Sequence, residues 1–313
     1  MKVSALNRRD FIKKSAECAA YAAAAISLPG LWKKAGAAEK TPDLIVATGE
    51  PGPATRAGLE AMGGMGRFVQ AGHKVVIKPN MSFPNPPEWA TTTHPEVVRE
   101  LAAMCLRAGA SSVLILDNPL RNAEISVERS GLRRACSDLP NTQVRGITNR
   151  RFFQEVSIPQ AKVLNTTMVM KEVLQADVLI AAPVAKSHSA TGVSLSMKGM
   201  MGLVYDRRTF HLDMDLDAAI VDLCTVVKPH LTVVDCSRIL SDGGPGGPGK
   251  VIPMNKIIVS RDFVAADAMA VEMGTWYGRT FKGHQVKHIQ MAHARGLGTL
   301  DIASLAVKEI QGS

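Results

Sequence analysis

The sequence predicts an α/β protein, with a mainly parallel sheet and helices on both of its faces. Short, almost wholly apolar runs of strand length alternate along the chain with amphipathic runs of helix length. Strands that are apolar on both sides are typical of parallel sheets, because crossover helices cover both faces. A chain of 313 residues, 46% apolar and 21% charged, has the composition of a globular protein with one or two domains.

The first half of the chain holds three apolar runs that predict buried strands: DLIVATG (43–49), HKVVIKPN (73–80) and SSVLILDNP (111–119). Helices are expected at 55–72, 94–109 and 124–135, and a further strand at 142–148. The helix at 94–109 is the clearest, because Thr93 and Glu96 fit a capping box and Gly109 fits a C-terminal stop.

The second half continues the alternation, with strands at 176–183, 231–237 and 255–260 and helices at 216–228 and 262–275. Residues 150–175 show no clear period. We therefore expect one α/β domain over 38–313, and a division into two lobes near 150–175 stays open.

The first 37 residues predict an export signal peptide. The charged stretch NRRDFIKK (7–14) precedes an alanine-rich apolar run and the small residues Ala35-Gly36-Ala37, and its Arg8-Arg9 pair is similar to a twin-arginine signal. We therefore expect a periplasmic or otherwise exported protein. No permanent membrane span is expected after cleavage, since no other stretch reaches the roughly 18 apolar residues that cross a bilayer.

The distribution of charge argues against a nucleic-acid partner. Seven of the 37 Lys and Arg residues lie in this signal, but only two of the 28 Asp and Glu residues do. The rest of the chain therefore carries a net charge of +4, against +9 for the whole. No dense Lys/Arg stripe, as nucleic-acid binding requires, remains in it.

Four cysteines follow the signal: Cys105, Cys136, Cys224 and Cys236. None belongs to a C-x-x-C motif, so no iron–sulfur cluster ligated by this chain is expected. Export permits a disulfide, whereas cysteines on apolar helix faces are commonly buried free thiols, so their pairing stays open.

Polar residues follow four of the predicted strands: Lys78-Pro79-Asn80, Asp117-Asn118, Lys186-Ser187-His188, and Asp235 with Asp242. Ligands of open α/β sheets bind beyond the carboxyl ends of the strands, so these groups predict a single cleft. Loop solvation explains any one group equally well. It explains less well why two of the groups place a lysine directly beyond a buried apolar run.

The segment AKSHSATGVSLSMKGMMGLVY (185–205) carries most of the site prediction. Lys186 and His188 leave the preceding strand, and Thr191-Gly192-Val193 is expected to start a helix with Lys198 one to two turns along it. Backbone N–H groups at a helix start suit a phosphate or carboxylate. The alternative is that the small residues and methionines of this segment only pack against a neighbour.

The chain resembles the domain-of-unknown-function 362 family, some of whose members are fused to ferredoxin-like iron–sulfur modules. The matching stretches are KPNM (78–81), TTHPEVVRELAAMCLRAGA (92–110), DVLIAAPVAKSHSATGVSLSMKGMMGLV (177–204), AAIVDLCTVVKPHLTVVDC (218–236), DGGPGGPGK (242–250) and RDFVAADAMAVEMG (261–274). The resemblance implies an α/β fold and a shared cleft formed by Lys78, Asn80, His94, Lys186, His188, Lys198 and Asp235. It implies no established reaction, and this chain lacks the C-x-x-C-x-x-C module of the fused members.

Three motif matches fail on their context. GPGGPGK (244–250) fits G-x-x-x-x-G-K, but Val251 replaces the Mg²⁺-binding Ser/Thr and a strand is expected to follow, so we interpret the stretch as a lid or turn. DMDLD (213–217) lacks the glycine and the glutamate of a calcium loop. HQVKH (284–288) lacks the glutamate of a zinc-protease motif and predicts a surface helix.

The leading hypothesis is an exported enzyme that acts on a small anionic substrate. His188 or His94 would act as acid or base beside Lys186, since histidine titrates near neutral pH. His211, which follows two arginines, is a weaker candidate. Residues expected to bind the phosphate or carboxylate are Lys78, Asn80, Lys198, Thr191 and Gly192.

A divalent metal held by Asp235 or Asp242 with a histidine is a further hypothesis. The alternative function is a non-enzymatic protein, exported in folded form, that binds a ligand or delivers a cofactor and is linked to iron–sulfur redox partners. Ligand retained in purified protein without turnover would favour this alternative. The oligomeric state stays open.

Overall fold

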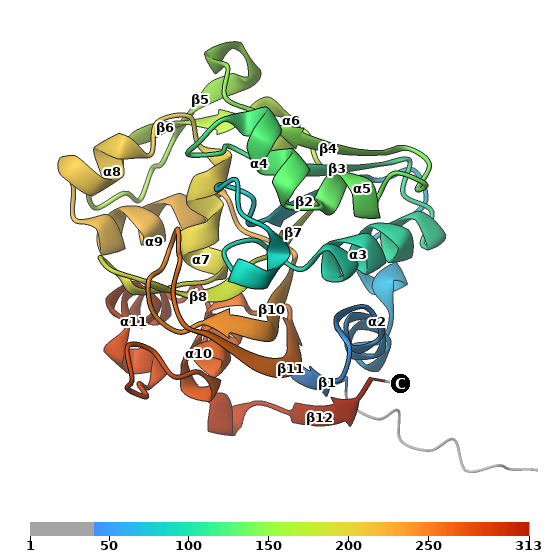
Figure 1. Cartoon of the computed structure of the whole chain (residues 1–313). Helices are drawn as coiled ribbons and strands as arrows, with labels where there is room; N and C mark the ends of the chain where they lie inside the picture. The colour runs from blue at the N-terminus through green and yellow to red at the C-terminus, as the bar shows by residue number, and fades with distance from the viewer. Residues whose placement is uncertain (1–40, 313) are drawn as a thin grey trace, which may run out of the picture. The chain divides into compact units, whose positions relative to one another are not determined.

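A ten-stranded sheet forms the centre of the protein, and eight strands lie along it in the order β12-β1-β11-β10-β7-β2-β3-β4 (Figure 1). The computed structural model describes residues 41–312, so the predicted export signal lies outside the described residues. The strands of this path are β1 (Leu44–Thr48), β2 (Lys74–Pro79), β3 (Ser112–Asp117), β4 (Thr142–Gly146), β7 (Val178–Ala182), β10 (Leu231–Leu240), β11 (Val251–Ser260) and β12 (Val307–Gln311).

Most neighbouring strands of the sheet run parallel, as the apolar runs predict. Strand β2 is parallel to both β3 and β7, β3 to β4, β7 to β10, and β1 to β12. Only β11 is antiparallel to its neighbours β1 and β10 along this path. The remaining strands, β8 (Val184–His188) and β9 (Gly192–Ser194), form a hairpin, and β8 also pairs with β10.

Helices cover both faces of the sheet, which confirms the predicted fold class (Figure 1). One face carries α2 (Pro51–Ala61), α3 (Pro95–Arg107), α4 (Ala123–Arg129) and α5 (Leu132–Ala135). The other carries α7 (Ser196–Gly199), α8 (Arg208–Leu212), α9 (Leu216–Val226), α10 (Phe263–Met273) and α11 (Lys287–Ala294). Successive strand residues alternate between two apolar cores, so Ile45 packs on the first face and Leu44 on the second.

A second, two-stranded sheet occupies the region whose pattern the sequence leaves unclear. It pairs β5 (Phe153–Ser157) antiparallel with β6 (Thr166–Met170), and α6 (Lys171–Leu174) follows. Phe153, Val169 and Met170 are buried in the core of the second face, so this small sheet packs on the same α/β body. The domain bounds stay a prediction.

The start of α3 differs from the predicted capping box. His94, not Thr93, is the N-cap residue, and its Nδ1 accepts a hydrogen bond from the Glu96 backbone N–H at 3.2 Å. The Thr93 hydroxyl accepts from the Asn80 backbone N–H at 2.9 Å and donates to the Ala182 carbonyl at 2.7 Å. Thr93 therefore joins the ends of β2 and β7, which a local capping pattern does not reveal.

The predicted helix start at Thr191 is wrong. Residues Gly192–Ser194 form β9, which pairs with β8, and the helix begins only at Ser196. Gly192 has a φ of +75°, a left-handed conformation that suits the end of a tight hairpin and is unfavourable inside a helix.

The histidine pair at 284–288 does not lie on a surface helix, as the sequence predicts. Helix α11 begins at Lys287, and His288 is fully buried, with its Nδ1 3.0 Å from the Asp217 Oδ1 atom. The carboxylate partner of His288 lies on α9 and is distant in the sequence, so the spacing of the two histidines does not reveal it.

The cysteines that the described residues contain, Cys105, Cys136, Cys224 and Cys236, are all buried and free, so no disulfide links them. Burial raises the pKa of Cys105 and Cys136 to about 12. These thiols belong to the apolar cores. Over residues 41–312, no helix has the length and apolar character needed to cross a membrane.

Candidate functional site

A buried ion pair stands at the carboxyl ends of two adjacent parallel strands. Lys78 near the end of β2 and Asp117 at the end of β3 lie side by side, with Lys78 Nζ 3.2 Å from Asp117 Oδ1. Asp117 Oδ2 also accepts from the Met81 backbone N–H at 3.0 Å and the Ser82 hydroxyl at 2.9 Å. The carboxylate therefore fixes the position of Lys78 and of the chain after β2.

Gly202 leaves the room that this ion pair occupies. A Cβ atom at this position would lie 2.2 Å from Asp117 Oδ1 and 2.4 Å from Lys78 Cε. Both distances are shorter than any real Cβ contact, so only glycine fits here.

Strand β8 continues the line of β7 beyond Pro183 and delivers two further polar side chains. Lys186 Nζ donates to the Thr91 carbonyl at 2.7 Å and lies 5.6 Å from the centre of the Phe83 ring. His188 Nδ1 accepts from the Ala190 backbone N–H at 3.2 Å. Both side chains are buried, and both line the same pocket.

Helix α7 presents Lys198 to that pocket. Lys198 Nζ lies 3.5 Å from His211 Nε2, and the His211 ring is stacked near the His188 ring, with 6.0 Å between centroids and 17° between planes. Buried Asp267 of α10 holds α7 in place, because its carboxylate accepts from the backbone N–H groups of Ser196 at 2.9 Å and Met197 at 3.0 Å. The N–H groups at the actual start of this helix are thus occupied by the protein's own carboxylate.

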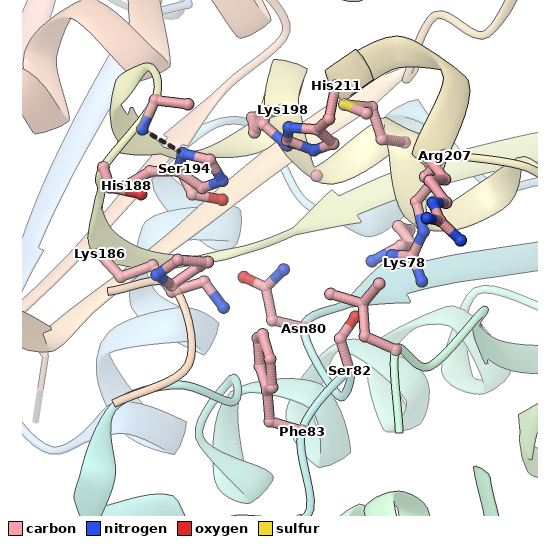
Figure 2. A pocket seen from close by; sticks show the side chains of 18 of the residues that line it. Lys78, Asn80, Ser82, Phe83, Lys186, His188, Ser194, Lys198, Arg207 and His211 are labelled. Atoms are coloured by element: carbon pink, nitrogen blue, oxygen red, sulfur yellow. Dashed lines mark hydrogen bonds between the residues drawn. The ribbon is translucent and has the colours of Figure 1, made fainter. Parts of the chain in front are cut away.

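These side chains surround one pocket of about 520 Å³ (Figure 2). Five cationic side chains line it, from four different segments of the chain: Lys78, Lys186, Lys198, Arg207 and Arg208. Among the described residues that line the pocket, none is Asp or Glu. Asp117, directly behind Lys78, is the nearest balancing charge, so the pocket carries an excess of positive charge.

Burial and mutual repulsion weaken proton binding by this cationic group. Desolvation, with Lys78 and Lys198 nearby, lowers the pKa of Lys186 to about 7, although Asp117 opposes the shift. Desolvation and Arg207 lower the pKa of Lys198 to about 7. Desolvation and the neighbouring lysines lower the pKa of His188 to about 3, so its ring is neutral at pH 7.

Five of the predicted site residues come together in the pocket: Lys78, Asn80, Lys186, His188 and Lys198. His211, the weaker candidate, joins them. Thr191 and Gly192 instead line a separate hollow with Asp217 and Lys287. The hairpin turn explains this, because it carries Thr191 and Gly192 past the pocket rim.

The other predicted site residues lie outside this pocket and form hydrogen bonds or an ion pair with other parts of the chain. His94 caps α3, and its backbone N–H donates to Asp235 at 2.7 Å. Asp235 also pairs with Arg238 at 2.9 Å, and Asp242 Oδ1 accepts from the Lys250 backbone N–H at 2.7 Å. The residues 41–312 contain no group of three or more His, Cys, Asp or Glu side chains placed to bind a metal ion. The metal at Asp235 or Asp242 stays a prediction.

Sequence reasoning missed several side chains that line the pocket. Ser82, Phe83 and Leu120 follow the ends of β2 and β3 in irregular segments, and Pro245 comes from the glycine-rich loop. A strand, β11, follows that loop as expected, and the Gly244 backbone N–H donates to the Ser187 hydroxyl at 3.0 Å. Only the position of Ser82, two residues after Asn80, signalled a role.

The sequence matches a known family of proteins. A family model described as "Domain of unknown function (DUF362)" matches residues 75–272, more than half of the chain. The chain belongs to the DUF362 family. All the pocket-lining residues of this DUF362 protein lie inside the matched segment.

Among curated proteins, this DUF362 chain is similar to the thylakoid-associated protein sll1697 of Synechocystis sp., with 27% identity over 228 residues and 69% of each chain covered. Among solved structures, it is similar to a Thermotoga maritima protein, with 13% identity and a TM-score of 0.49 over 72% of this chain and 60% of that one. It is also similar to a lactate racemase apoprotein from Thermoanaerobacterium thermosaccharolyticum, with 12% identity and a TM-score of 0.45 over 71% of this chain and 54% of that one.

Proposed function

We propose that this DUF362 protein is an enzyme whose pocket binds a small anion bearing a carboxylate or a phosphate. One observation carries the proposal. Three buried lysines and two arginines face a pocket of about 520 Å³ that no described acidic side chain lines. Buried charge of one sign is costly unless a counter-charge arrives, so a bound anion would stabilise this arrangement.

The residues fall into distinct roles toward such an anion. Lys78, held by Asp117, and Arg207, whose guanidinium donates to the Asn118 carbonyl, are fixed in position to contact the anion, which would favour their charged forms against the lowering of their pKa by burial. Lys186 and Lys198, with pKa values of about 7, gain protons when an anion binds beside them. They also exchange protons readily at neutral pH, which general acid–base catalysis requires.

His188 would act as a hydrogen-bond donor toward the substrate. Its Nδ1 accepts from the Ala190 backbone N–H, so the neutral ring carries its proton on Nε2. An N–H group of a neutral imidazole can polarise a carbonyl or phosphoryl oxygen without releasing its proton. This role replaces the general base that the sequence alone suggests for His188.

Thermal unfolding with and without phosphate, sulfate and small dicarboxylates tests the proposal. The unmodified protein should melt at a higher temperature with at least one of these anions, because ligands that bind only the folded state stabilise it. Lys186→Met and Lys198→Met should lose that rise and should not melt lower than the parent without ligand. The control Lys250→Met, at an exposed lysine of the glycine-rich loop, should behave like the parent.

Two results would contradict the proposal. A parent protein that no anion stabilises would remove the binding site. Variants that melt far lower without ligand would show that the lysines are architectural. Proton NMR would then show whether the protein converts a stabilising anion. An enzyme would turn the anion over, whereas a binding or delivery protein would retain its ligand unchanged.

We also propose that the twin-arginine signal exports the protein. The Arg8-Arg9 pair, the apolar run and Ala35-Gly36-Ala37 support it. Changing both arginines to lysine should leave full-length protein in the cytoplasm. Normal export and processing of that variant would exclude a twin-arginine route.

A further inference from the structure

The three pocket lysines differ in what holds their amino groups. Lys78 pairs with Asp117 and donates to the Pro79 carbonyl. Lys186 donates to the Thr91 carbonyl and lies over the face of the Phe83 ring. An acceptor oxygen and an aromatic face both favour the charged ammonium form. Burial still lowers the pKa of both lysines, but these contacts fix where their amino groups lie. Lys78 and Lys186 are therefore placed to bind an anion.

Lys198 lacks such a setting. Within residues 41–312, its amino group forms no ion pair with an acidic side chain, and its polar contact is His211 Nε2 at 3.5 Å. An imidazole can accept a proton from the amine and return it. An amine within reach of a base that a neighbouring group orients, here through the stack on His188, is the arrangement of an activated nucleophile.

We propose that Lys198 is the nucleophile of this pocket and forms an imine with the carbonyl group of an anionic substrate, a 2-oxo acid or a phosphorylated ketone. The inference rests on the proposed anion site and assigns it a substrate class. Lys78, Lys186 and Arg207 line the same pocket as Lys198 (Figure 2). Their cationic groups would hold the carboxylate or phosphate and present the carbonyl carbon to Lys198. The lowered pKa of Lys198 keeps a large share of its amine neutral at pH 7.

The step needs no co-reactant beyond the two partners. The neutral amine attacks the carbonyl carbon, a C–N bond forms, and the carbonyl oxygen becomes a hydroxyl. His211 carries both amine protons from the nitrogen to this oxygen in turn: the first makes the hydroxyl, and the second lets it leave as water when the C–O bond breaks and the C=N bond forms. Nothing is oxidised or reduced, and hydrolysis restores the amine.

Borohydride trapping tests the inference with the full chain. Protein is incubated with pyruvate in one arm and dihydroxyacetone phosphate in the other, then reduced with sodium borohydride and mapped by peptide mass spectrometry. We expect a saturable adduct on Lys198 in at least one arm, well above the label on exposed Lys250, and inorganic phosphate should suppress it. The productive arm identifies the anionic group that the pocket prefers.

Variants show whether Lys198 acts as a nucleophile or only as a positive charge. Lys198→Arg keeps the cation, so the probe should still raise the melting temperature while the adduct disappears. His211→Asn should slow adduct formation by roughly 100-fold, the usual effect of removing a general base, with binding retained. Lys250→Arg should change neither.

The outcomes distinguish this inference from the anion site itself. If the probes raise the melting temperature but Lys198 is labelled no more than Lys250, or Lys186 is labelled instead, the nucleophile is wrong and the anion site stands. If neither probe raises the melting temperature and no adduct forms, the inference is wrong. The anion site is then wrong as well only if phosphate, sulfate and small dicarboxylates also leave the melting temperature unchanged.

Discussion

At the scale of single residues, the structure gives one residue type several roles. Lys78, Lys186 and Lys198 are all buried, yet an aspartate, a backbone carbonyl and a histidine are their respective partners. Position after apolar strands was enough to predict that Lys78 and Lys186 share a cleft, whereas Lys198 was expected there from a helix that was predicted to start at Thr191. Their partners come from segments 13 to 95 residues away, so sequence could not assign their roles.

Gly202 gives the sharpest prediction at this scale. Gly202→Ala would push a methyl group against Asp117 and Lys78, so we expect a loss of about 1–3 kcal/mol in unfolding free energy, typical of overpacking, together with loss of anion binding. Urea unfolding and anion-dependent melting would measure both.

Gly66 offers the matched control. A Cβ atom at Gly66 would meet no atom within 4 Å, and Gly66 does not have a positive φ. The unfolding free energy of Gly66→Ala should therefore stay within about 0.5 kcal/mol of that of the parent. A harmless Gly202→Ala substitution would mean that the Lys78–Asp117 pair is not packed as described.

At the scale of elements, the apolar strands were predictable and the connections between them were not. The bounds of β2, β3 and β7 follow from short apolar runs, whereas the hairpin at β9 depends on pairing with β8. The four-residue helix α7 depends on Asp267, a buried carboxylate 71 residues away that holds its first turn. Periodicity cannot detect an element that tertiary contacts fix.

Asp267 supplies the prediction at this scale. Asp267→Ala would leave the Ser196 and Met197 N–H groups and the Ser196 hydroxyl without their buried partner, at a cost of about 1–3 kcal/mol for each group. It should also displace Lys198 and weaken anion binding.

The comparison is Asp215→Ala, which removes the N-cap acceptor of α9 and an exposed ion pair with Lys287. A cost of about 1 kcal/mol with unchanged anion affinity is expected there. Equal effects of both variants on anion affinity would show that Asp267 does not position Lys198.

At the scale of the whole molecule, the parallel sheet brings the ends of β2, β3 and β8 to one place and thereby concentrates positive charge. The α/β fold class was predictable because apolar runs of strand length alternate along the chain with runs that have a helical pattern. The placement of His94, Thr191 and Gly192 outside the pocket was not, because it depends on how loops cross the sheet edge.

Concentrated charge makes stability depend on pH. The pKa values of Lys186 and Lys198 lie near 7 in the folded protein, below the ordinary 10.5, so the unfolded chain binds more protons above pH 7. The free energy of unfolding should therefore rise from pH 7 to pH 9, by up to about 1.4 kcal/mol per pH unit for each lysine.

Urea titrations without anions measure this slope. Lys186→Met and Lys198→Met should each flatten it, and Lys250→Met should not. The window stops at pH 9 because the raised pKa values of buried cysteines act in the opposite direction above it. A flat or falling profile for the parent would show that the lysines are charged without a ligand.

Isothermal titration calorimetry of anion binding is the most direct test of the cationic pocket. The stabilising anion would be titrated at pH 8 in two buffers of different ionisation enthalpy, and again at pH 6.5 and pH 9. Because an anion favours the charged lysines, binding should take up roughly one to two protons at pH 8 and weaken toward pH 9. Lys186→Met and Lys198→Met should each reduce the uptake. Binding with no proton uptake and no pH dependence, or no binding at all, would contradict an anion site built from these lysines.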